Sequence, residues 1–294
     1  MKKAILIVLL ILTFYLNYLP HSTYNYPLHV DEWVHLTYAK HLNSNSPLYF
    51  NEQGKSLEHG FHILLSVLDS LKVDYLFMFN FFPALFSVLI CLALFILVRK
   101  HFDETTALFS IFFFIMLESS VALLGSMFLV PLTLGLFFIP IGLFLVKSKS
   151  LFLIIASALI IHPFSGIALL ILINCYLLNE FIHTKKINFK VILQQFYGIL
   201  LSLPLFLDPL LNKGIENLSF NASIIPFYFL PRVFGYLILG MILVGIYLMN
   251  SKKKYTFNFY ILILLAVKSG LIERMGIKIK QIYLKEFMHY YTLD

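Results

Sequence analysis

The chain has 294 residues, of which 60% are hydrophobic and only 13% are charged. A soluble domain carries about a quarter of its residues as charged side chains, so this composition excludes a water-soluble globular protein and predicts an integral membrane protein. The formal net charge of +7 does not indicate a nucleic-acid partner, because the cations concentrate in short loops between apolar segments.

The chain begins with two lysines and an apolar run that no small-residue cleavage site follows. We therefore expect an uncleaved first membrane helix. Apolar runs near the ~20 residues that span a bilayer predict nine passes in a single transmembrane domain covering residues 1–294. The predicted passes are 4–19, 75–98, 107–124, 127–146, 151–162, 164–178, 191–207, 233–249 and 257–272.

The loops between these passes separate by charge. Five short basic stretches, which hold 12 of the 22 Lys and Arg residues, fall on one side of a nine-pass arrangement. The positive-inside rule makes that side cytoplasmic. We expect a multi-pass protein of the cell membrane with a cytoplasmic N-terminus and an extracytoplasmic first long loop, residues 20–74.

The segments 151–162 and 164–178 are each too short for a comfortable span and are separated only by Pro163. Basic residues flank the pair at both ends, so one crossing would violate the charge rule. We predict a hairpin with the sequence HPFSG at its outer apex. Irregular backbone at membrane depth must be buried in protein or line a wet cavity, so we expect this apex to border a cavity.

The loop 20–74 holds six of the ten histidines. After Pro27 we predict a helix over residues 31–42. A second helix, capped by Ser56, would carry an apolar face and lie in the membrane interface with that face toward the lipid. The apolar face would contain Phe61, Leu64, Leu65, Leu68 and Leu71.

The acidic pair of the first of these helices has two interpretations. Asp31, His35 and Tyr38 follow helical spacing along one stripe, with Glu32 beside it. Asp31 is then a general base with hydrogen-bonding neighbours. Alternatively, Asp31 only caps the helix or stabilises its first turn.

Four further polar residues stand near predicted passes. Glu118 lies inside the third pass, where ionisable side chains are costly and often functional; the alternative is a buried pair or a protonated carboxyl. His162 either lines a cavity or satisfies carbonyls freed by the helix break. Arg232 and Arg274 lie on the predicted outer side, opposite to the basic loops. They either bind an anionic lipid phosphate or snorkel at the interface.

Metal binding is an alternative interpretation of the same loop. Glu32 and His35, and likewise His59 and His62, are three residues apart and suit a divalent ion. No HExxH, CxxC or DxD motif is present. No cofactor is therefore firmly implied.

The order of these features resembles the GT-C superfamily of membrane glycosyltransferases, which includes protein O-mannosyltransferases, oligosaccharyltransferase catalytic subunits and lipid A aminoarabinose transferases. The resemblance rests on HVDEWVHLTYAKHL after the first helix, LEHGFHILLSVLDSL as an amphipathic outer helix, the two passes joined by VRKHFDE, and ALIIHPFSG. It covers residues 1–180 by motif and the remainder by topology. The chain is short for this family, and its tail, residues 271–294, is expected to be interfacial, so we expect a short or truncated member.

The resemblance implies an all-α helical bundle that transfers a sugar from a polyprenyl-phosphate carrier to an acceptor, with inversion. It implies that Asp31, with Glu32 as neighbour, deprotonates the acceptor. Substrate contacts are expected from His35, Tyr38, His59, His62, Glu118, His162, Arg232 and Arg274. The partners would be the lipid-linked sugar, an unknown acceptor and membrane lipids. The alternatives are a transporter that uses Glu118 and His162, or a non-catalytic lipid-binding scaffold.

Overall fold

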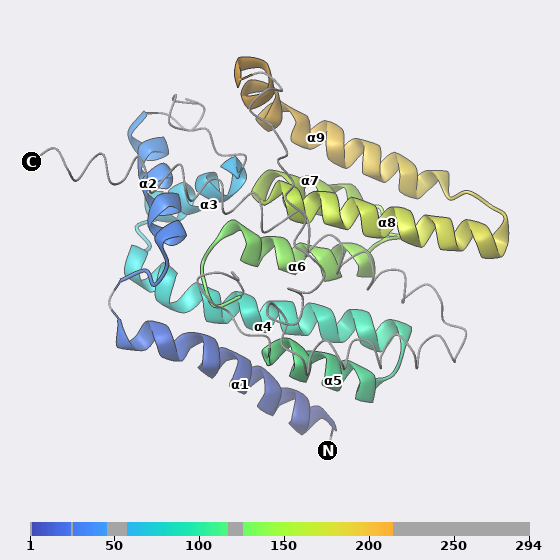
Figure 1. The fold of residues 1–294 in the computed structure, drawn as a ribbon, viewed down its shortest axis with the longest axis horizontal. Coiled ribbons are helices and arrows are strands. Elements are labelled where there is room, and N and C mark those ends of the chain that lie inside the picture. Colours follow the sequence, from blue (N-terminus) through green and yellow to red (C-terminus); the bar gives the residue numbers. More distant parts are fainter. Residues whose placement is uncertain (1, 25, 46–57, 117–125, 214–294) are drawn as a thin grey trace, which may run out of the picture. The chain divides into compact units, whose positions relative to one another are not determined.

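The structure is a computed structural model that describes residues 2–24, 26–45, 58–116 and 126–213. All of these except Lys213 belong to one compact unit, Met1–Asn212. Regular secondary structure in the described residues is entirely helical, as predicted (Figure 1). In chain order the helices are α1 (Lys2–Thr23), α2 (Val30–Asn45), α3 (His59–Ser70), α4 (Tyr75–His101), α5 (Glu104–Ile115), α6 (Pro131–Phe144), α7 (Leu151–Ile161), α8 (Pro163–Thr184) and α9 (Phe189–Lys213).

Three of the described helices are long and apolar enough to cross a membrane, namely α1, α4 and the first 19 residues of α8. Helices α5, α6, α7 and the first part of α9 are apolar but shorter. These helices identify a membrane-embedded helical protein. The predicted pass 107–124 lies partly outside the described residues, and the passes 233–249 and 257–272 lie wholly outside them.

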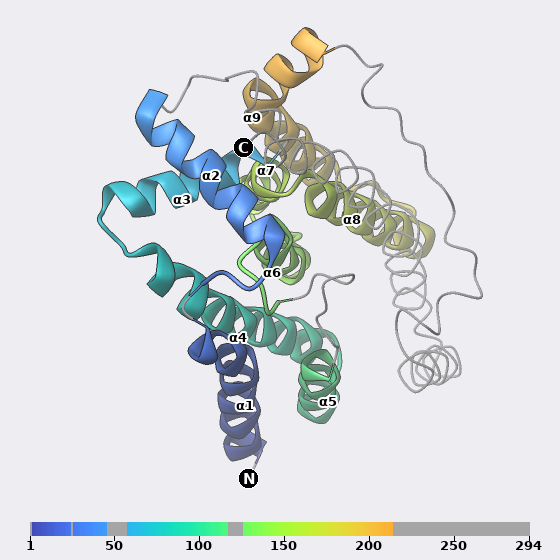
Figure 2. The same cartoon turned by 60° about the vertical axis from the view of Figure 1, so that its left-hand side comes forward.

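Helix α4 is the centre of the arrangement, because α1, α5 and α6 all pack against it (Figure 2). Helix α1 runs antiparallel to α4, because Thr13 lies beside Cys91 and Phe14 beside Phe81. Helix α6 in turn packs against both α7 and α8. Helices α1 and α4 therefore cross this unit in opposite directions.

Local sequence explains where α4 and α5 begin and end. The Asp74 carboxylate accepts a hydrogen bond from the N–H of Phe77, and Asp103 accepts one from Thr106. Each is an N-cap that satisfies a backbone donor with no partner inside its helix. Arg99, Lys100 and His101 occupy the last turn of α4, where cations interact favourably with the helix dipole.

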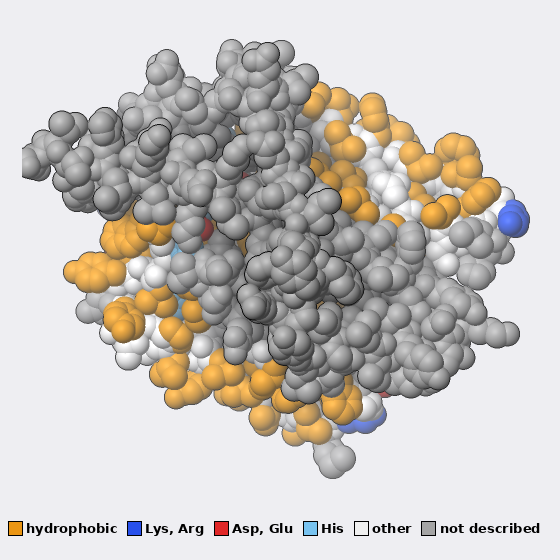
Figure 3. Space-filling view, viewed as in Figure 1, with side chains coloured by type: hydrophobic (Ala, Val, Ile, Leu, Met, Phe, Trp, Pro, Cys, Tyr) orange, Lys and Arg blue, Asp and Glu red, His pale blue; other side chains and the backbone are white. Residues whose placement is uncertain are grey.

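The basic loops of the described residues gather at one end of this unit. The Lys2 ammonium donates to Thr105 Oγ1 and the Lys100 ammonium to the Phe144 carbonyl, so the start of α1, the turn between α4 and α5, and the end of α6 meet there. Helices α2 and α3 lie at the opposite end (Figure 1). In Figure 3, hydrophobic side chains cover much of the visible described surface, and Lys and Arg side chains appear toward the right and lower right.

Helices α7 and α8 form the predicted hairpin. His162 alone separates them, in an extended backbone conformation with φ −146° and ψ 94°, and Pro163 is the first residue of α8. Extended backbone is what a residue before proline favours, so the HP dipeptide both ends α7 and starts α8. Gly166 lets the two helices approach closely, because a Cβ there would touch Leu159.

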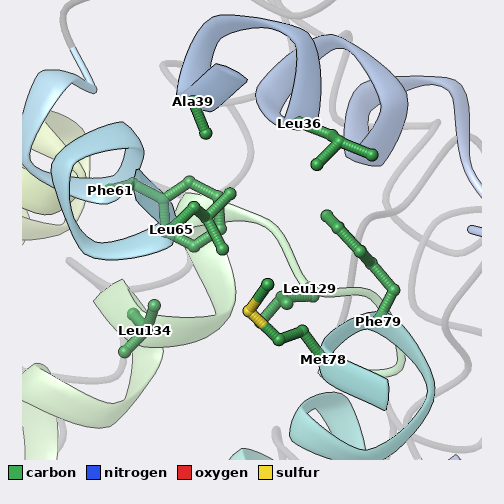
Figure 4. Packing of buried hydrophobic residues seen from close by; sticks show 8 residues of the cluster. All are labelled: Leu36, Ala39, Phe61, Leu65, Met78, Phe79, Leu129 and Leu134. Atoms are coloured by element: carbon green, nitrogen blue, oxygen red, sulfur yellow. The ribbon is translucent and has the colours of Figure 1, made fainter. Parts of the chain in front are cut away.

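Helices α2 and α3 attach to the bundle through a hydrophobic cluster, which we call the α2–α3 core (Figure 4). The apolar face of α3 is used here, so Phe61 and Leu65 pack on protein rather than on lipid. Leu71 lies one residue beyond the end of α3 and is 69% exposed. Glu58, not the predicted Ser56, occupies the N-cap position of α3, and Ser56 lies outside the described residues. The core consists of Leu36, Ala39, Phe61, Leu65, Met78, Phe79, Leu129 and Leu134.

Truncating Leu65 tests this attachment. Leu65 is 1% exposed, and a buried Leu→Ala change costs about 2–5 kcal/mol through lost burial and a residual cavity. We expect Leu65→Ala to lower the apparent Tm of the detergent-purified protein by several degrees. Leu71→Ala is the matched control and should leave Tm unchanged; equal effects of the two substitutions would contradict the packing described here.

Candidate functional site

The acidic pair at the start of α2 divides between the interior and the surface. The Glu32 side chain is fully buried, whereas the Asp31 side chain is 38% exposed. The buried face of α2 continues from Glu32 through His35, Leu36 and Ala39 at helical spacing. The adjacent carboxylates therefore occupy different environments, and only that of Asp31 is accessible.

Glu32 joins two parts of the chain that are distant in sequence. Its Oε2 accepts a hydrogen bond of 3.0 Å from the N–H of His29, and its Oε1 accepts one of 2.7 Å from the N–H of Leu129. Burial raises the pKa of Glu32 to about 7, and the backbone N–H donors limit that rise. Glu32 thus fastens the start of α2 to the segment that precedes α6.

The backbone N–H of Asp31 is hydrogen-bonded to a neighbouring side chain, while its carboxylate lies at the surface. Its N–H donates to His29 Nδ1 at 3.1 Å, and its Oδ2 lies 3.4 Å from the same nitrogen. The His29 ring is buried against Phe128, with 5.0 Å between ring centroids. Because Nδ1 accepts a hydrogen bond, the proton of a neutral ring is assigned to Nε2, which finds no partner among the described residues.

A second group of polar side chains, which we call the histidine–glutamate cluster, consists of His35, Glu58, His62, His162 and Ser165. His35 Nδ1 and His62 Nε2 share a hydrogen bond of 2.9 Å. Glu58 lies between two imidazoles, with Oε2 3.9 Å from His35 Nε2 and Oε1 3.5 Å from His162 Nε2. The cluster links α2, α3 and the break between α7 and α8.

His162 has a structural role at this break. His162 is the N-cap of α8, because its Nδ1 accepts a hydrogen bond of 3.2 Å from the N–H of Ser165. The same nitrogen lies 2.7 Å from Ser165 Oγ. The proton of the neutral ring is therefore assigned to Nε2, which faces Glu58. Gly135 of α6 permits this approach, because a Cβ there would overlap Ser165.

Burial keeps Glu58, His35 and His62 uncharged near neutral pH. It raises the pKa of Glu58 to about 8, and nearby Asp31 contributes in the same direction. It lowers the pKa of His35 to about 3, and it also lowers the pKa of His62. The cluster therefore combines a protonated carboxyl with neutral imidazoles, an arrangement that joins helices without burying net charge.

The structure brings together several of the predicted site residues. His35, His62 and His162 belong to the histidine–glutamate cluster, and the Tyr38 ring contacts that of His62 at a tilt of 42°, with 5.0 Å between ring centroids. His59 is buried at the start of α3. The predicted residues Glu118, Arg232 and Arg274 lie outside the described residues.

Sequence reasoning did not single out Glu58 or His29, and it placed Ser165 only within the apex sequence HPFSG. Glu58 lies four residues before His62, a spacing that brings two side chains together on a helix. Ser165 lies three residues after His162, which is the spacing of an N-cap and its N3 residue. His29 precedes Asp31 by two residues, and no general pattern marks that arrangement.

The metal interpretation finds no support in the described part of the chain. No three His, Cys, Asp or Glu side chains there are arranged to hold a metal ion. Both oxygens of Glu32 already accept backbone hydrogen bonds, which is why the Glu32 and His35 spacing does not produce a ligand pair.

Comparison with known proteins found no match: no family model, no curated protein and no solved structure matches this chain.

Glu32→Gln tests the joint between α2 and the segment before α6. Glutamine offers one oxygen and an NH₂ group that cannot accept, so one buried backbone N–H loses its acceptor at a cost of about 1–3 kcal/mol. We expect a lower apparent Tm in a thermal unfolding assay. Asp31→Asn, in the same turn but exposed, is the control and should unfold like wild type. A wild-type Tm for Glu32→Gln would argue against the joint.

The shifted pKa values predict a stability maximum between about pH 6 and 7. The pKa values of His35 and His162 are lowered from 6.5 to about 3, and that of His62 is lowered too, so these three rings contribute stability that is present above pH 6.5 and lost as pH falls below it. Below pH 6.5 these three rings outweigh the two carboxyl groups, which act in the opposite direction. Glu58, raised from 4.5 to about 8, contributes stability that is present below pH 4.5 and lost as pH rises through 8. Glu32 acts in the same direction as Glu58.

Glu58→Gln isolates the alkaline part of this profile. The Glu58 side chain is 23% exposed, so we expect its contribution between pH 6.5 and 8.5 to be on the order of 1 kcal/mol. The Tm of Glu58→Gln, measured over this range, should fall less than that of wild type. Identical pH profiles for the two proteins would exclude a protonated Glu58 at neutral pH.

Proposed function

We propose that this protein is a membrane glycosyltransferase that takes a sugar from a polyprenyl-phosphate donor. The observation that carries the proposal is the division of the acidic pair: buried Glu32 fixes the start of α2, and neighbouring Asp31 presents an accessible carboxylate there. The resemblance of residues 1–180 to the GT-C superfamily supports the same assignment. The fold proposed for the whole chain is a GT-C-like bundle of nine passes.

In the proposed reaction, Asp31 accepts the proton of the acceptor hydroxyl as the acceptor oxygen attacks the anomeric carbon. The new carbon–oxygen bond forms as the bond from that carbon to the phosphate oxygen breaks. The electron pair leaves with polyprenyl phosphate, and the anomeric configuration inverts. Glu32 acts as a positioning residue, because its oxygens are engaged by backbone N–H groups.

A single carboxylate is sufficient for this chemistry. Glycoside hydrolases need a second carboxyl group to protonate a poor leaving group. The leaving phosphate here is already a stable anion and needs charge stabilisation instead. Arg232 and Arg274 are our proposed sources of that stabilisation.

The proposed orientation places α2 and α3 on the extracytoplasmic side. Four of the five basic stretches lie within the described residues, and contacts of Lys2, Lys100 and Lys147 join their loops at the other end of the unit. The positive-inside rule favours the cytoplasm for that end. A polyprenyl-linked donor in the outer leaflet would then meet Asp31 at the membrane surface.

Asp31→Asn is the direct test of the catalytic assignment. Loss of a general base costs about 10²–10⁴ in rate, so we expect the lipid-linked sugar substrate to accumulate as it does in a null strain. Mass spectrometry of the polyprenyl-phosphate-sugar pool, at matched protein levels, measures this accumulation.

Asp74→Asn is the matched control, because Asp74 is an exposed carboxylate at the same end and asparagine caps a helix equally well. It should leave the pool at the wild-type level. A wild-type pool in Asp31→Asn cells would exclude Asp31 as the base. If neither the null strain nor Asp31→Asn alters the pool and Glu118→Gln abolishes function, the transporter alternative is favoured.

A further inference from the structure

A groove opens at the basic end of the unit, away from Asp31 and the histidine–glutamate cluster. It has a volume of about 860 Å³ and lies between the turn joining α6 to α7, the start of α7, and α9. Polar and basic residues occupy one end of it, and apolar residues of α9 continue from there as far as Pro204. The groove is therefore amphipathic along its length.

The basic end of the groove carries cations available to an external anion. Lys147 also lines the groove but is engaged, since its ammonium lies 2.9 Å from the Glu180 carboxylate. Lys149 and Lys190 are exposed and have no ion-pair partner in the described part of the chain. The parallel helices α7 and α9 both begin at this end, and their positive dipole ends add to the same field.

The apolar part of the groove has a floor and exposed walls. Gly198 allows α9 to pack closely on α7, because a Cβ there would meet Ile155. The N–H of Phe152 donates to Gln194 Oε1, which fixes the floor. Tyr197 and Leu201 line it and are 45% and 51% exposed.

The length of the groove fits one lipid leaflet. Fourteen residues of α9 separate Lys190 from Pro204, which corresponds to roughly 20 Å of helix. One leaflet contributes about 15 Å of hydrocarbon. A molecule with an anionic head group and an apolar chain of about 15 Å therefore matches both the charge at the basic end and the length of the groove.

We propose that this groove binds an anionic phospholipid, with its phosphate between Lys149 and Lys190 and one acyl chain along α9. Ordinary lipid contact would explain the apolar side chains alone. The pairing of two uncompensated lysines with a formed groove favours a specific anionic occupant. Such binding would not depend on sugar transfer, because the groove shares no residue with the proposed catalytic site.

Native mass spectrometry of the detergent-purified full chain tests this assignment. The protein is titrated with phosphatidylglycerol and with phosphatidylcholine of the same acyl composition. We expect wild type to prefer phosphatidylglycerol. Lys149→Ala/Lys190→Ala should lower the affinity for phosphatidylglycerol by about 30-fold, which corresponds to ~1 kcal/mol per lysine, and should leave phosphatidylcholine binding unchanged. Lys149→Arg/Lys190→Arg should retain the preference.

Lys185→Ala/Lys186→Ala removes the same charge at the same end but outside the groove lining, and it should keep the preference. An unchanged preference in Lys149→Ala/Lys190→Ala, or an equal loss in the control, overturns the proposal. A photoreactive p-benzoyl-phenylalanine at position 197 provides a second readout that needs no lysine variant. Cross-linking to added phosphatidylglycerol supports the assignment, and cross-linking to residues 214–294 instead would overturn it.

Discussion

The two backbone hydrogen bonds accepted by Glu32 are the constraint on which the candidate site depends. They connect the N–H of His29 to the N–H of Leu129, 97 residues farther along the chain than Glu32, through one buried carboxylate. A buried carboxylate is costly unless its oxygens are satisfied, so this arrangement strongly favours one position of α2 against the segment before α6. These hydrogen bonds also fix the position of Asp31, because Asp31 directly precedes Glu32 in the same helical turn.

The two ends of the helical unit solve the problem of charge in different ways. At the end formed by α2 and α3, a protonated Glu58 and neutral imidazoles join three helical elements without net charge. At the other end, the lysines lie at the surface, and Lys100 donates to the Phe144 carbonyl and Lys147 to the Glu180 carboxylate. This asymmetry accords with the proposed orientation. The proposed reaction takes place at the polar end near Asp31, and cationic loops favour the cytoplasmic side of the membrane.

Much of the fold could be predicted from periodicity and from helix-breaking residues. The hairpin of α7 and α8 follows from Pro163, and the helix at Asp31 follows from Pro27 and the acidic first turn. The detailed site could not be predicted, because its contacts join distant segments. No local pattern indicates that Glu32 rather than Asp31 is buried, that Leu129 is its partner, or that Glu58 lies between His35 and His162. The prediction that the apolar face of α3 lies on lipid is wrong, because amphipathicity alone does not distinguish a lipid surface from the α2–α3 core.

The most direct test of the central claim, that Asp31 acts as a base in a single displacement, is the stereochemistry of transfer. The purified protein would be given the polyprenyl-phosphate sugar that accumulates in null cells, and NMR would determine the anomeric configuration of the transferred sugar. A base-assisted single displacement predicts complete inversion. Retention would contradict the account, because it requires a covalent intermediate and makes the carboxylate a nucleophile.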